Sequence, residues 1–149
     1  MKFDRFGIDE EFCAENDYKI FFGVDWLSDE EYESFDEFFA GRDLFITVAG
    51  KPDDHVKVQS FSEAVKTESE FVDQDKFIFS PGYACIYVSD DRDIFVVASS
   101  PERIGKLISS ISDKGGVTYS ALVKNGTNSP KKQVKEFFDH WRTFNVEVS

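Results

Sequence analysis

Three short apolar segments between residues 76 and 98 constrain the fold more than any other feature of this sequence. The segments are Lys76–Ser80, Tyr83–Val88 and Asp93–Ala98. Pro81-Gly82 separates the first two, and Asp90-Asp91-Arg92 lies between the second and the third. Because neighbouring parallel strands need a crossover of roughly a dozen residues or more, connections this short predict an antiparallel meander of three strands.

Four other segments have the pattern of strands. Residues 17–24 carry apolar side chains at alternate positions, and residues 55–59 alternate as a short edge strand does. Residues 44–49 form a nearly continuous apolar run, which is typical of a strand in the middle of a sheet. Residues 117–123 are predicted to form a further strand after a pair of glycines.

Four helices are predicted from their first residues and their apolar stripes. Ser28 and Ser60 each open a Ser-x-x-Glu capping box, in which the serine and the glutamate bond N–H groups at the helix start. Ser100-Pro101 and Ser129-Pro130 place proline at the first helical position, where a missing N–H is harmless. The stripes consist of Tyr32, Phe35, Phe38 and Phe39; of Phe61, Val65 and Val72, interrupted by Glu68; of Ile104, Leu107, Ile108 and Ile111; and of Val134, Phe137, Phe138 and Trp141.

This order of elements predicts an α+β fold. We expect residues 1–149 to form a single acidic domain with a mainly antiparallel sheet of about five to seven strands. About four helices should pack on it and cover one face or end of the sheet. Aromatic residues make up 16% of the chain, so rings are the expected material of the core.

The two cysteines, Cys13 and Cys85, point to no metal site or redox pair. They form no CxxC motif and no cluster with histidine at the spacing of zinc ligands. Cys85 lies in the apolar segment Tyr83–Val88, which predicts a buried thiol; a disulfide would require an oxidising compartment.

The N-terminus has no apolar stretch of the kind found in a signal peptide, and no run approaches the about 18 apolar residues of a membrane span. We therefore expect a cytoplasmic protein that binds no membrane.

Charge is distributed very unevenly along the chain. The formal net charge is −12, and residues 1–43 alone hold fourteen acidic and four basic residues, a net charge of −10. Such a surface repels nucleic acid and attracts basic proteins; the simpler interpretation is that the acids keep the protein in solution. The last predicted helix has a few basic side chains on one side, which we interpret as a solvent-exposed helix face. Direct nucleic-acid binding is therefore not expected. This basic flank consists of Lys131, Lys132, Lys135 and Arg142.

The most acidic segment is SDEEYESFDEFF, residues 28–39. Its rings fall on one side of the predicted helix, and Glu30, Glu33, Asp36 and Glu37 fall on the opposite side. We predict that these four carboxylates bind the partner. The acidic turn Asp90, Asp91 and Asp93 is a second candidate, and it lacks the glycine and the distal glutamate of a calcium-binding EF-hand loop.

Catalytic motifs do not stand out. His55 and His140 lie in no metal-binding or nucleophile-activating frame, and no phosphate-binding glycine loop precedes a helix. With 29 acidic residues, a pair of carboxylates suited to hydrolysis carries no information. We expect no catalytic residue, no cofactor and no bound metal.

In character the chain resembles bacterial toxin-immunity proteins, including those of contact-dependent growth inhibition systems. The resemblance is carried by Asp9-Glu10-Glu11, the helix at residues 28–39, the aromatic-rich strands and the lack of catalytic motifs. It implies an inhibitor that neutralises a basic toxin, for example a nuclease, by covering it with an acidic surface. A regulatory or adaptor module with a non-toxin partner, and an enzyme with an unrecognised site near His55 or His140, remain the alternatives. The sequence does not set the oligomeric state.

Overall fold

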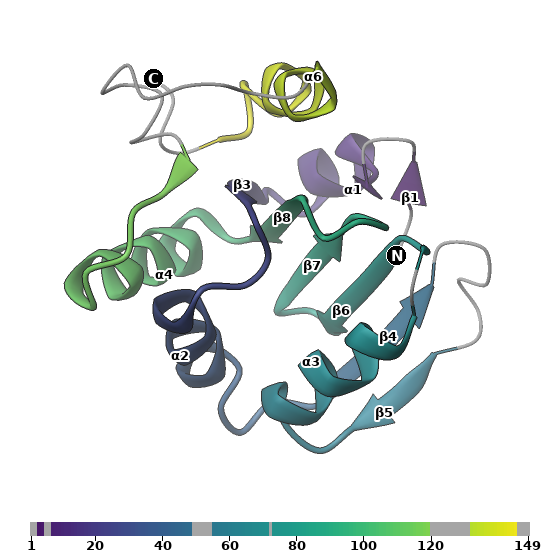
Figure 1. Ribbon diagram of the computed structural model, residues 1–149. Coiled ribbons are helices and arrows are strands. Elements are labelled where there is room, and N and C mark those ends of the chain that lie inside the picture. The colour runs from purple at the N-terminus through teal and green to yellow at the C-terminus, as the bar shows by residue number, and fades with distance from the viewer. Residues whose placement is uncertain (1–2, 5–6, 49–54, 72, 120–131, 146–149) are drawn as a thin grey trace.

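An antiparallel sheet of six strands forms the centre of the molecule (Figure 1). The computed structural model describes residues 3–4, 7–48, 55–71, 73–119 and 132–145. Along the sheet the strand order is β3-β8-β7-β6-β4-β5. The strands are β3 (Lys19–Val24), β4 (Leu44–Val48), β5 (Val56–Val58), β6 (Lys76–Ser80), β7 (Ala84–Val88) and β8 (Ile94–Ser99). The predicted α+β class is confirmed.

The predicted meander is the middle of this sheet. β6 pairs with β7, and β7 pairs with β8, both antiparallel and in the register Ile78↔Ile86 and Ile86↔Val97. β4 then adds to β6, and β3 adds to β8. The short strand at Val56–Val58 lies at the edge, as its alternating sequence predicted.

Helices cover both faces of the sheet, so the expectation that they cover one face or end is wrong. The helices are α1 (Glu10–Glu15), α2 (Asp29–Phe38), α3 (Phe61–Glu70), α4 (Pro101–Asp113) and α6 (Lys132–His140). β2 (Gly7–Ile8) forms a small antiparallel hairpin with β1 (Phe3–Asp4). α2, α3 and α4 share one apolar core with one face of the sheet (Figure 1). A second core lies on the other face and is shared by α1, α6 and strand β2. The reason is visible in β7 and β8, which are buried at every position, so both faces of these strands need a cover.

The ends of the helices follow the predicted caps. Ser28 and Glu31 form the complete capping box: Glu31 N donates to Ser28 Oγ at 3.2 Å, and Ser28 N donates to Glu31 Oε1 at 3.0 Å. Ser60 accepts from Glu63 N at 3.2 Å, but the Glu63 carboxylate accepts from Gln59 N, one residue before the cap. The second box is therefore half formed.

The predicted strand at residues 117–123 is wrong for its first three residues, and residues 120–123 lie outside the described part of the chain. Val117 and Thr118 have no strand pairing, and Tyr119 is helical. The ring of Tyr119 packs on Phe22 and Phe138, with centroids 5.3 and 5.2 Å apart. This segment contributes an aromatic cover to the sheet instead of another strand. Residues 129–131, the predicted start of the last helix, also lie outside the described residues.

Candidate functional site

The acidic helix α2 packs against α4, and this contact divides the four carboxylates predicted to bind a partner. Glu33 and Asp36 are exposed. Glu37 is exposed but forms an ion pair with Lys114 of the α4 C-terminus, with Nζ and Oε2 3.2 Å apart. Glu30 is half-buried. The four side chains therefore do not form one uniform solvent face.

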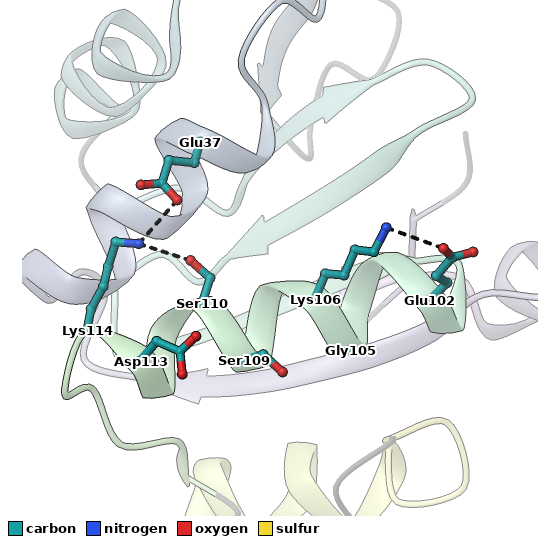
Figure 2. A pocket seen from close by; sticks show the side chains of 8 residues that line it. All are labelled: Glu37, Glu102, Gly105, Lys106, Ser109, Ser110, Asp113 and Lys114. Atoms are coloured by element: carbon teal, nitrogen blue, oxygen red, sulfur yellow. Dashed lines mark hydrogen bonds and ion pairs between the residues drawn. The ribbon is translucent and has the colours of Figure 1, made fainter.

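Above the apolar core that α2 and α4 share, the contact between the two helices includes polar side chains (Figure 2). Lys114 lies between Glu37 and Ser110, and Ser110 Oγ donates to Ser34 Oγ at 3.0 Å. Further along α4, Lys106 pairs with Glu102 at 3.3 Å. Both lysines, together with Glu37, Glu102 and Ser110, line an open groove of about 630 Å³. Because its bases already contact acids of the same groove, it offers little net charge to a ligand.

A more uniform charge is found at the start of α2. Asp25 and Asp29 are exposed there, and the backbone just before α2 is bonded to the turn between β7 and β8. Asp25 N donates to Asp93 O at 3.0 Å, and Trp26 N donates to Arg92 O at 2.9 Å. The fold thus joins the two acidic segments that the sequence presented as separate candidates. We name the acids of this region the acidic surface, although Arg92, whose side chain is 40% exposed, lies among them; the acids are Asp25, Asp29, Glu30, Glu31, Glu33, Asp36, Asp90, Asp91 and Asp93.

The acidic surface contains a pocket of about 280 Å³. On one side the pocket is lined by Asp25, Glu30 and Glu31, and on the other by the segment after α4, including Gly116 and Tyr119. No basic side chain of the described residues lines it. A Cβ at Gly116 would lie 3.2 Å from the Cβ of Glu30 and 2.6 Å from Ile111 Cγ2. Glycine at this position therefore lets the segment approach α2 closely enough to form the wall. We name this cavity the acidic pocket.

Glu31 is the carboxylate that sequence analysis assigned only to the helix cap. Burial raises the pKa of Glu31 above its ordinary value; hydrogen bonds from Ser28 oppose this rise, and the negative charges of Glu30 and Asp25 add to it. A cation entering the acidic pocket would stabilise the charged form of Glu31. No group of three His, Cys, Asp or Glu side chains among the described residues could hold a metal ion. A lysine or arginine side chain is the kind of cation that this arrangement suits.

The acids of the β7–β8 turn differ in what they contact. Asp91 Oδ1 accepts hydrogen bonds from Ser89 Oγ at 2.9 Å and from Asp93 N at 3.1 Å, so it stabilises the turn itself. Asp90 is exposed, and its backbone N donates to Asp75 Oδ1 at 2.9 Å. Of the three predicted turn residues, Asp90 has the side chain most open to a partner.

Under this turn lies a group of charges that the sequence did not reveal. Glu68, which appeared to interrupt the apolar stripe of α3, is fully buried. Its Oε1 lies 3.4 Å from Lys76 Nζ and 3.0 Å from Arg92 Nε. Two features of the sequence could have indicated this cluster: Glu68 interrupts an apolar stripe, and Lys76 begins an apolar strand. We name these three residues the charge cluster.

The other candidates from the sequence lie elsewhere. His55 packs beside the rings of Phe45 and Phe79, while His140 Nε2 lies 3.8 Å from Glu10 Oε2. Within the basic flank, Arg142 pairs with Asp139 and Lys132 with Glu136, and Lys131 falls outside the described residues. Cys13 and Cys85 are both buried without a disulfide, and burial raises the pKa of the Cys85 thiol.

Comparisons with protein-family models, with curated proteins and with solved structures found no match. In the part of the chain that the structure describes, no helix has the length and apolar character needed to cross a membrane. The function must therefore be inferred from the acidic surface and its pocket.

Proposed function

We propose that this protein is a non-catalytic inhibitor that binds a basic protein through the acidic surface. The observation that carries the proposal is the acidic pocket, where three carboxylates line a cavity without a basic side chain among the described residues. In the specific form implied by the sequence resemblance, the chain is an immunity protein and its partner is a toxin with a basic cleft, for example a nuclease.

Two physical effects support this mode of binding. The net charge of −12 attracts a basic protein over a distance of about one Debye length, roughly 8–10 Å at moderate salt, which accelerates association. The acidic pocket then receives one lysine or arginine side chain of the partner, because Asp25, Glu30 and Glu31 compensate its charge. α2 and the β7–β8 turn flank the pocket and contribute to an interface that typically covers about 800 Å² per partner.

The first experiment is a pull-down of the tagged protein from the lysate of its own host, at low and at moderate salt. We expect one basic protein to be retained stoichiometrically, and we expect Glu33→Lys/Asp36→Lys to slow its association and to weaken the salt dependence. Glu11→Lys/Glu15→Lys is the matched control, since these exposed residues belong to α1 on the other face of the sheet. Equal loss in both variants would assign the effect to net charge and exclude the acidic surface as the interface.

A second experiment addresses inhibition. The gene for the retained partner is expressed with and without this protein; an immunity protein restores growth if the partner is lethal. Restored growth should survive His55→Ala/His140→Ala, because neither histidine lies in the acidic surface. A partner that is not lethal would favour the regulatory module, and loss of rescue in the histidine variant would favour an enzyme.

A further inference from the structure

A second charged pocket lies at the opposite ends of α2 and α4 from the acidic pocket. It has a volume of about 290 Å³ and is formed by the residues after α2, the N-terminus of α4 and Tyr83 of the β6–β7 turn. Three of its side chains are basic: Arg42, Arg103 and Lys106. We name it the arginine pocket. A cationic pocket in a chain with a net charge of −12 requires an explanation.

Both guanidinium groups are held against one ring. Arg42 Cζ lies 4.0 Å and Arg103 Cζ 4.7 Å from the centroid of Tyr83. Tyr83 is itself fixed, because its hydroxyl donates to Phe38 O at 2.8 Å. Arg103 Nη1 donates to Tyr83 O at 3.1 Å. One ring therefore contacts both cations of this pocket.

No carboxylate pairs with either arginine in the described part of the chain. By contrast, Arg92 pairs with Glu68 and Arg142 with Asp139. Among the described residues, the one acid that lines the arginine pocket is Glu102, which is largely exposed and pairs with Lys106 at 3.3 Å. The N-terminus of α4, capped by Ser100, adds the positive end of a helix dipole. The unbalanced charge at this site is positive.

We propose that the arginine pocket binds a small molecule through an oxyanion, either a phosphate or a carboxylate. Guanidinium groups bind both anions with two parallel hydrogen bonds, and the side chains of Arg42, Arg103 and Lys106 are the cationic donors that line this pocket. The volume is close to the lower bound of about 300 Å³ for small-molecule sites. This site is independent of the proposed function, because it lies at the other ends of α2 and α4 and has the opposite charge.

The test is a titration of the full chain followed by NMR of the arginine Nε–H groups. Inorganic phosphate tests the phosphate source, and succinate tests the carboxylate source; sodium chloride at matched ionic strength gives the background. We expect saturable shifts of Arg42 and Arg103 with at least one of the two anions. The anion that gives saturable shifts identifies whether the natural ligand carries a phosphate or a carboxylate. Shifts no larger than those in sodium chloride with both anions would overturn the proposal.

Variants locate the site. Arg42→Gln, at an exposed position, should weaken the binding by about tenfold, the size expected for one charged hydrogen-bonding group. Arg142→Gln is the control, since Arg142 also contacts a ring, Phe138, but has a carboxylate partner in Asp139. Equal weakening in both variants would overturn the assignment. Lys106→Gln provides a second variant if Arg42→Gln does not fold.

The result can be separated from the proposed inhibitor function. Arg42→Gln should leave retention of the basic partner unchanged, and Glu33→Lys/Asp36→Lys should leave anion binding unchanged apart from the general effect of net charge. Failure of the anion titration therefore says nothing against the acidic surface, and failure of the pull-down says nothing against the arginine pocket.

Discussion

Glu68 shows at the scale of a single residue how a buried charge depends on its neighbours. Both Glu68 and Lys76 are almost completely buried, while the side chain of Arg92 is 40% exposed. Arg92 also has a φ of 62°, a left-handed conformation that a side chain adopts with some strain. We infer that Arg92 occupies this turn because its guanidinium reaches Glu68.

Removing one member of the charge cluster should therefore destabilise the fold strongly. We expect Glu68→Gln to lower the free energy of unfolding by about 3–5 kcal/mol, because it leaves Lys76 buried without a carboxylate. Lys76→Met should also destabilise, and the double variant should lose less than the sum of the two. Urea denaturation of the four proteins measures this coupling. If the loss of unfolding free energy in the double variant equals the sum of the two single losses, Glu68 and Lys76 do not act as a pair.

Glu31 leads to a prediction about pH. Because burial raises its pKa in the folded protein, the folded state binds this proton more tightly than the unfolded chain does. Glu31 therefore contributes most to the free energy of unfolding at acid pH. This contribution is lost as the pH rises from the pKa of Glu31 in the unfolded chain, about 4.3, to above its raised pKa in the folded protein. Glu31→Gln keeps an acceptor for Ser28 N but cannot titrate. We expect its free energy of unfolding, measured in urea from pH 4 to pH 7, to decline less with pH than that of the wild type. An unchanged slope would contradict the shift.

At the scale of elements, two glycines have opposite roles in the strands and helices that carry them. Gly23 lies in β3 opposite Phe95 of β8, and a Cβ there would lie 2.0 Å from Cζ of that ring. Gly105 lies inside α4, and a Cβ there would meet no atom within 4 Å. β3 thus needs its glycine for packing, whereas α4 does not.

Alanine substitutions should separate these roles. Gly23→Ala should lower the free energy of unfolding by about 1–3 kcal/mol through overpacking against Phe95. Gly105→Ala should raise it by about 0.5–1 kcal/mol, because alanine favours the helix. Thermal or urea unfolding measures both changes. A neutral Gly23→Ala would mean that the ring of Phe95 moves aside without loss of packing.

At the scale of the whole molecule, α2 and α4 separate two charged regions. The acidic pocket lies at the start of α2 and just after α4, and the arginine pocket lies after α2 and at the start of α4. Between them the groove of Figure 2 contains paired charges of both signs. This arrangement places the two proposed binding sites at opposite ends of the α2–α4 pair.

Much of the fold follows from local pattern, and the sequence alone predicted it. The short connections at Pro81-Gly82 and Asp90–Arg92 allow only an antiparallel meander, and Ser28 with Glu31 specifies where α2 begins. Such features depend on residues close together in the chain, so the amino-acid order determines them. α1 and the small hairpin before it were missed because each is six residues or shorter, too short for a periodic pattern.

Only the tertiary structure decided which charges are available. The helix period placed Glu30, Glu33, Asp36 and Glu37 on one side of α2, but packing against α4 half-buried the first and paired the last with Lys114. The same packing made Gly116 and Tyr119 a wall of the acidic pocket. The sequence by itself determined the α+β class, the meander, the capping box at Ser28 and the acidic character of α2. The covering of both faces, the charge cluster and the two pockets depend on contacts between distant residues, which no local period encodes.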